Sequence, residues 1–169
     1  MSAFLAGYTI VHVLISLVGI ASGLIVLAGL FVGKRLDAWT LLFLVTTVAT
    51  SVTGYGFPFE HLLPSHIVGA ISLVVLALAV YARYARHMVG VWRVVYVVSA
   101  ALALYLNVFV LIVQLFLKVP ALHALAPTQA ELPFGVTQFV VLVVFLVVGA
   151  LAARRSRGME GFSPPPRQA

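Results

Sequence analysis

The stretch FLAGYTIVHVLISLVGIASGLIVLAGLFV, residues 4–32, is followed directly by Gly33-Lys34-Arg35. It contains no Asp, Glu, Lys or Arg, and it exceeds the roughly 20 apolar residues that a helix needs to cross the hydrocarbon core of a bilayer. A basic pair directly after such a run is typical of a cytoplasmic membrane surface. The stretch therefore predicts a membrane-spanning helix whose C-terminal end lies in the cytoplasm.

Four further apolar runs follow, at residues 38–57, 62–81, 91–117 and 134–153. With 63% hydrophobic and 8% charged residues among 169, almost the whole chain is needed for membrane crossings, and no room remains for a soluble domain. The predicted fold class is an all-α integral membrane bundle of five transmembrane helices over residues 1–157. Residues 158–169, which include three consecutive prolines, have too little apolar surface to order themselves and are expected to form a disordered cytoplasmic tail.

The basic residues predict the orientation of this bundle, because cytoplasmic loops carry an excess of Lys and Arg. All of them except Lys118 fall after the first, third and fifth runs or at the start of the fourth. This pattern places the N-terminus outside and the C-terminus in the cytoplasm of a cell inner (plasma) membrane, and it requires an odd number of spans. The residues concerned are Lys34, Arg35, Arg83, Arg86, Arg93, Arg154, Arg155, Arg157 and Arg167.

Composition excludes several function classes. The net charge of +6 is explained by residues at the membrane surface, so the expected partner of this charge is the lipid bilayer and not a nucleic acid. The chain has no cysteine, which excludes thiolate chemistry. No carboxylate lies inside a predicted span, which disfavours a carboxylate-driven ion pump. The sequence identifies no catalytic residue.

Polar residues inside the spans are the candidate site residues, because such groups are costly in hydrocarbon. His12 shares a helix face with Ser16, Gly19 and Gly23, small residues that allow another helix to approach closely. Asn107 and Gln114 likewise share a face of the fourth span. From the helical rise of about 1.5 Å per residue, His12, Gln114, His66 and Gln138 are all expected in the outer half of the membrane, with Asn107 nearer the midplane.

This distribution predicts a pocket lined by histidines and amides near the outer surface. Neutral imidazole is a common metal ligand and the axial ligand of haem b, so His12 and His66 are the candidate haem ligands of an electron-transfer protein. Participation of Glu60, His61 or His123 would instead favour a transition metal. Asn107, Gln114 and Gln138 are expected to orient the ligand, which could also be the headgroup of a quinone.

Two alternatives stay open on the sequence alone. The polar residues could serve only helix packing, in a non-catalytic accessory or assembly subunit that binds other membrane subunits or forms a homo-oligomer. A small oligomeric transporter is less favoured, because the chain has no evident internal repeat and no intramembrane charge.

Overall fold

The structure, a computed structural model, describes residues 3–57 and 64–158. Every regular element in this part of the chain is helical, which confirms the predicted all-α class. The elements are α1 (Ala3–Phe31), α2 (Asp37–Gly54), α3 (Pro64–Val80) continued by the π-helical turn η1 (Tyr81–Ala85), α4 (Val91–Lys118), the short α5 (Pro120–Leu125) and α6 (Leu132–Gly158).

Four of the described helical segments are long and apolar enough to cross a membrane: α1, α3 with η1, α4 and α6. α2 has 18 residues, and Asp37 together with its threonine and serine side chains makes it less apolar than the other four. A membrane bundle is thus supported by length and composition. The short helix α5, which lies between α4 and α6, was not expected from the sequence.

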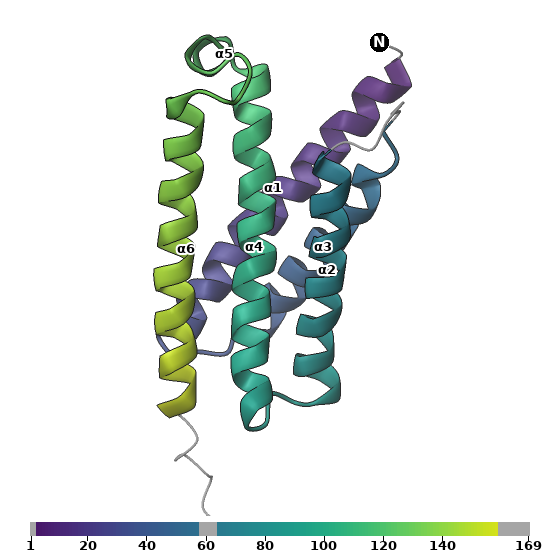
Figure 1. Ribbon diagram of the computed structural model, residues 1–169. Coiled ribbons are helices and arrows are strands. Elements are labelled where there is room, and N and C mark those ends of the chain that lie inside the picture. Colours follow the sequence, from purple (N-terminus) through teal and green to yellow (C-terminus); the bar gives the residue numbers. More distant parts are fainter. Residues whose placement is uncertain (1–2, 58–63, 159–169) are drawn as a thin grey trace, which may run out of the picture.

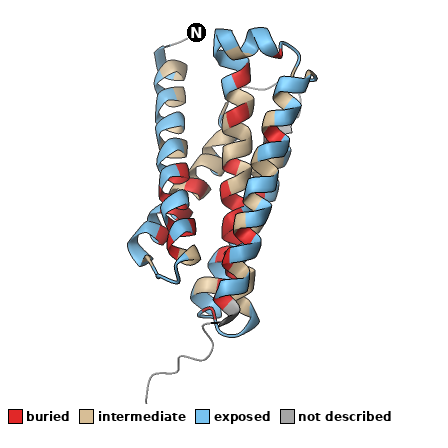
Figure 2. Cartoon of the chain, turned by 90° about the vertical axis from the view of Figure 1, so that its left-hand side faces the viewer, coloured by how far each residue is buried: buried red, intermediate tan, exposed pale blue. Residues whose placement is uncertain are grey.

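The long helices run side by side, and α1 is inclined so that it passes behind α4 in the view of Figure 1. α5 covers the end of the bundle at which α1 begins, and α6 ends at the opposite end. Buried residues follow the inner faces of the helices, whereas the outward faces are exposed (Figure 2). The described chain therefore begins at one end of the bundle and finishes at the other (Figure 1).

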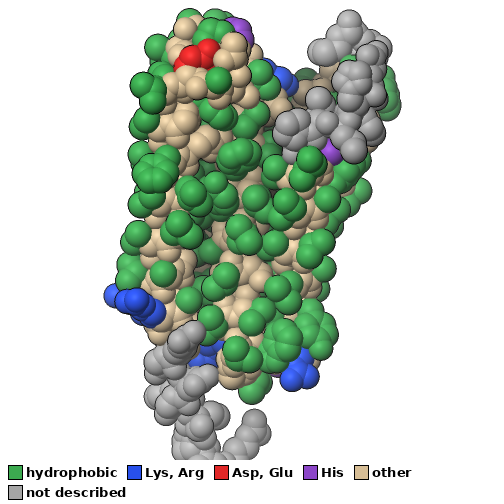
Figure 3. Space-filling view, in the orientation of Figure 1, with side chains coloured by type: hydrophobic (Ala, Val, Ile, Leu, Met, Phe, Trp, Pro, Cys, Tyr) green, Lys and Arg blue, Asp and Glu red, His purple; other side chains and the backbone are tan. Residues whose placement is uncertain are grey.

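The core is centred on α4, whose buried face carries Ser99, Ala100 and Ala103 and so lets its neighbours approach closely. Large apolar side chains instead project outward from α6, where Phe139 is 65% and Leu146 is 61% exposed. Apolar side chains also cover most of the surface seen in Figure 3. An outward apolar face is the expected arrangement for helices surrounded by lipid.

Arg83, one of the basic residues that predict the orientation, lies inside the bundle end and not in solvent. Its side chain is 8% exposed and forms an ion pair with Asp37 of α2. Its guanidinium carbon also lies 5.3 Å from the ring centroid of Tyr96, a cation–π contact with α4. Arg83 thus connects η1 to two other helices, which the sequence pattern did not indicate.

Candidate functional site

α1 makes close approaches to α2 and α4 at Gly19 and Gly23, both of which are buried. A Cβ atom at position 23 would lie 2.6 Å from Cδ1 of Leu104 and 2.8 Å from ring carbons of Phe43, so only glycine fits there. Toward its N-terminal end, α1 diverges from α4 (Figure 1). The small residues that the sequence identified on α1 therefore set the point from which a pocket opens between α1, α2, α3 and α4.

This pocket is called the outer pocket because it lies toward the end of the bundle that the sequence predicts to be outside. Its volume is about 590 Å³, within the range of roughly 300–1,000 Å³ typical of small-molecule sites. Its wall is mostly apolar, and each of the four helices contributes polar side chains. Among the lining residues that the structure describes, only Lys118 is a Lys, Arg, Asp or Glu, and it is exposed. The polar lining residues are Thr9, His12, Ser16, Thr50, Ser51, His66, Ser72, Asn107, Gln114 and Lys118.

His12 is held in the pocket wall by α2. Its Nδ1 lies 2.8 Å from Oγ1 of Thr53, and that hydroxyl lies 2.6 Å from the carbonyl oxygen of Ala49, to which it donates. Because the single hydroxyl proton points to Ala49, the Thr53 oxygen accepts from His12, which assigns the proton of the neutral ring to Nδ1. Nε2 is then left with a lone pair, and no described residue donates a hydrogen bond to it.

Asn107 of α4 lies close to Gly19, where α1 approaches its neighbouring helices. Its Oδ1 accepts a hydrogen bond of 3.3 Å from Ser16 Oγ. Its Nδ2 has no hydrogen-bond partner among the described residues, although Asn107 is only 8% exposed. A buried amide nitrogen without an acceptor costs about 1–3 kcal/mol, so an acceptor from outside the described residues would stabilise this group.

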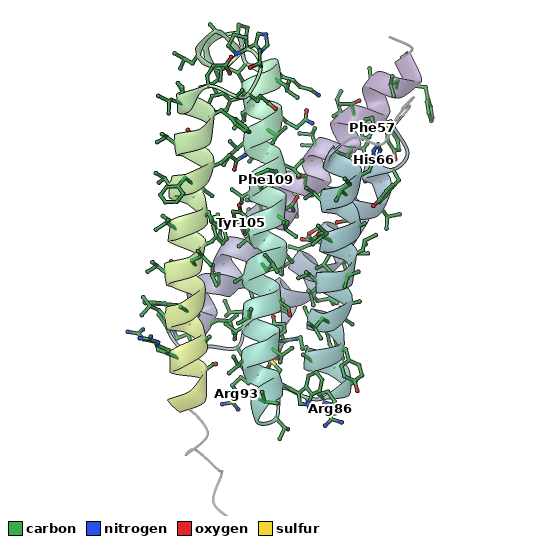
Figure 4. All side chains as sticks on the ribbon, viewed as in Figure 1. Phe57, His66, Arg86, Arg93, Tyr105 and Phe109 are labelled. Carbon is green, nitrogen blue, oxygen red and sulfur yellow. The ribbon has the colours of Figure 1, made fainter. Side chains whose placement is uncertain are left out.

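His66 lies in the first turn of α3 and is buried beside Tyr55. The two ring centroids are 5.5 Å apart, and Tyr55 donates a hydrogen bond of 2.7 Å to the carbonyl oxygen of His66. Figure 4 shows His66 and Phe57 together at the upper end of the bundle, and the Phe57 ring packs edge-on against His12 at 5.1 Å. An aromatic ring thus packs against each of the two histidines of the pocket.

The two predicted glutamines lie in different places. Gln114 lines the pocket, and its side chain makes no hydrogen bond with the described part of the chain. Gln138 of α6 is buried and donates a hydrogen bond of 3.2 Å to the carbonyl oxygen of Phe109 on α4. It does not line the pocket, so the structure brings together His12, His66, Asn107 and Gln114 without it.

The remaining candidate metal ligands are not joined to this pocket. His123 is exposed on α5, where its Nδ1 lies 3.3 Å from the carbonyl oxygen of Phe116. Glu60 and His61 lie outside the described residues. Within residues 3–57 and 64–158, no group of three or more His, Cys, Asp or Glu side chains is placed to hold a metal ion.

Five polar residues of the pocket were not identified from the sequence as site residues: Thr9, Thr50, Ser51, Ser72 and Lys118. The hydroxyl oxygens of Ser51 and Ser72 lie 3.2 Å apart across the α2–α3 contact. Thr50 has a buried hydroxyl without a partner among the described residues, and Lys118 is the last residue of α4. The spacing of His66, Gly69 and Ser72 by three residues could have indicated a shared face of α3. Spacing alone could not distinguish Thr50, which lines the pocket, from the other threonines of α2.

Comparisons with protein-family models, with curated proteins and with solved structures found no match to this chain.

Proposed function

We propose that the outer pocket binds a lipid-soluble quinone, in its oxidised or reduced form. The observation that carries the proposal is the buried Asn107 Nδ2, a hydrogen-bond donor on the pocket wall without an acceptor among the described residues. The walls are mostly apolar, and apart from the exposed Lys118 the described lining contains no Lys, Arg, Asp or Glu, which suits an uncharged ring with oxygen substituents better than a charged ligand.

The two hydrogen-bonding groups have complementary roles in this proposal. Asn107 Nδ2 donates to a ring oxygen of either form of the ligand. His12 Nε2 accepts from a hydroxyl of the reduced form, because the contact with Thr53 keeps the ring proton on Nδ1. Val13, Leu17 and Leu115 line the pocket and are 39–44% exposed, so they form a rim along which an apolar tail could extend into lipid.

A second candidate ligand is haem b, and the observation that favours it is the same lone pair on His12 Nε2. A hydrogen bond at Nδ1 commonly fixes the ring of an iron-ligating histidine, and His66 on another helix would supply the second ligand. The two candidates differ in an absorption spectrum of the purified protein. Haem gives a Soret band with bands that sharpen on reduction by dithionite, whereas a quinone gives neither.

The orientation predicted from the basic residues is part of the proposal. Five spans, with the N-terminus outside and the C-terminus in the cytoplasm of an inner membrane, would place the pocket near the outer surface. Two features support this arrangement: α1 begins and α6 ends at opposite ends, and most of the Lys and Arg side chains visible in Figure 3 gather where α6 ends. At 18 residues, α2 is about 27 Å long, close to the roughly 30 Å of hydrocarbon.

Cysteine labelling tests this orientation without background, because the chain contains no cysteine. Ala124 of α5 and Val89 of the turn before α4 are both exposed. In intact cells, a membrane-impermeant maleimide is expected to label Ala124→Cys and to leave Val89→Cys unlabelled until the membrane is permeabilised. If only Val89→Cys is labelled in intact cells, the orientation is the reverse of the predicted one. Equal labelling of the two variants in intact cells would also contradict the predicted orientation.

Asn107→Leu tests the quinone site, with Gln138→Leu as its matched control. Both changes remove a buried amide of similar size, but only Asn107 lines the pocket. In lipid nanodiscs, Asn107→Leu is expected to weaken binding of a short-tailed benzoquinone by about tenfold, the value of one hydrogen bond of about 1.4 kcal/mol. Gln138→Leu is expected to leave this binding unchanged.

Thermal unfolding of the same variants separates ligand binding from packing. Leucine at position 107 removes the unpartnered donor together with the acceptor of Ser16, whose hydroxyl can turn to a carbonyl of its own helix, so the unfolding temperature is expected to change little. If Asn107→Leu instead lowers the unfolding temperature and wild-type protein binds no benzoquinone, the amide serves helix packing. The accessory-subunit alternative would then be favoured.

A further inference from the structure

A second groove lies between α1 and α6, and it is separate from the outer pocket. Its volume is about 380 Å³, and every side chain that lines it is apolar. The lining residues belong to the C-terminal half of α1 and to the middle of α6: Leu24, Leu27, Ala28, Phe31, Val32, Val144, Phe145 and Val148. Leu24, Ala28 and Val144 are also exposed, so the groove lies at the outward surface of these helices.

One end of this groove carries an arginine. Nη1 of Arg155 donates a hydrogen bond of 2.9 Å to the carbonyl oxygen of Phe31, and its guanidinium carbon lies 4.2 Å from the centroid of the Phe31 ring. Phe31 both lines the groove and forms the last residue of α1. The aromatic contact and the carbonyl together hold the guanidinium where the apolar groove ends.

The charge at this end has no carboxylate partner among the residues that the structure describes. The ion pair that the structure shows in residues 3–57 and 64–158 joins Arg83 to Asp37, and Arg155 has no carboxylate partner there. The other N–H groups of Arg155 have no acceptor among the described residues. Lys34 and Arg35 follow Phe31 closely in the chain and are exposed, as is Arg154.

We infer that this groove binds one acyl chain of an anionic phospholipid, whose phosphate pairs with Arg155. Guanidinium groups bind phosphate through two parallel hydrogen bonds, and the free donors of Arg155 allow this geometry. A basic site between transmembrane helices on the cytoplasmic side is a favourable position for an anionic headgroup. An apolar groove that ends in a guanidinium without a described carboxylate partner is complementary to the two parts of such a lipid.

Native mass spectrometry of the full-length protein tests the headgroup contact. The probe is dioleoyl phosphatidylglycerol, added to protein in a detergent with dioleoyl phosphatidylcholine as competitor. Wild-type protein is expected to retain phosphatidylglycerol preferentially, and Arg155→Gln to lower its retention about fivefold or more, the effect expected of one basic group near an anionic lipid. The control is Arg86→Gln, because Arg86 also lies over an aromatic ring, 5.1 Å from that of Trp92, but not beside the groove.

The acyl-chain contact requires a second pair of variants. Ala28 lines the groove, whereas Ala77 of α3 is equally an exposed alanine but lies outside it. Ala28→Phe is expected to fill the groove and reduce retention of phosphatidylglycerol, and Ala77→Phe to leave it unchanged. Equal retention of the two lipids, equal effects of Arg155→Gln and Arg86→Gln, or full retention by Ala28→Phe would each overturn the inference. None of these outcomes depends on the quinone pocket.

Discussion

Gly23→Leu is expected to destabilise the bundle by at least about 3 kcal/mol, near the upper end of the usual cost of overpacking. A Cβ at this position already lies 2.6 Å from Leu104 and 2.8 Å from Phe43, and both of these side chains are 1% exposed. Neither can move away without displacing further core residues. For a chain of this length, the loss corresponds to a fall of roughly 6–12 °C in the unfolding temperature.

Thermal unfolding in detergent, followed by scanning fluorimetry, measures this effect. Gly7→Leu is the matched control, because Gly7 lies on the same helix and a Cβ there meets no atom within 4 Å. Leucine at this exposed position is expected to be neutral or slightly stabilising, since it favours helix more than glycine does. If Gly23→Leu proves as stable as Gly7→Leu, the close helix approach described here is wrong.

His12→Leu is expected to weaken binding of a reduced, short-tailed quinol by about tenfold or more, because the ligand hydroxyl loses its acceptor in a mostly apolar pocket. Binding of the oxidised quinone is expected to change less, since the His12 tautomer held by Thr53 has no Nε2 proton to donate. Titration of both forms into nanodiscs, with oxygen excluded for the quinol, measures the difference.

Thr53→Val and Thr53→Ser are the controls for the role of the tautomer. Valine removes the acceptor of the Nδ1 proton, so Thr53→Val is expected to reduce the preference for quinol over quinone. Serine keeps the hydroxyl, so Thr53→Ser is expected to keep this preference. Equal losses for both ligand forms in His12→Leu would indicate a packing role only. A Soret band that is present in wild type and absent in His12→Leu would favour haem b over the quinone.

The helical class and the approximate extent of the long helices follow from the sequence. In hydrocarbon every backbone N–H and C=O group must be paired, so uninterrupted apolar runs of this length form helices. The run at residues 4–32 corresponds to α1 at Ala3–Phe31, and the run at 91–117 corresponds to α4 at Val91–Lys118. The spacing of Ser16, Gly19 and Gly23 also indicated the face of α1 that meets other helices.

The candidate site followed from the sequence only in part. The rise per residue along a helix gives the depth of a polar group, and depth correctly grouped His12, His66 and Gln114 near one end. Depth does not say which helix lies beside a given face. Gln138 lies at a comparable depth, but it faces α4 from α6 and does not reach the pocket.

The sequence by itself determined which segments are helices, which polar side chains they carry and where the small residues lie, because these properties are local and repeat with the helical period. Only the tertiary structure decided which faces meet. The inclination of α1 opens the pocket on one side of α4, Arg83 is buried against Tyr96, and Arg155 ends beside Phe31. These contacts join residues far apart in the chain, and they depend on how the helices pack around each other, which no single helix encodes.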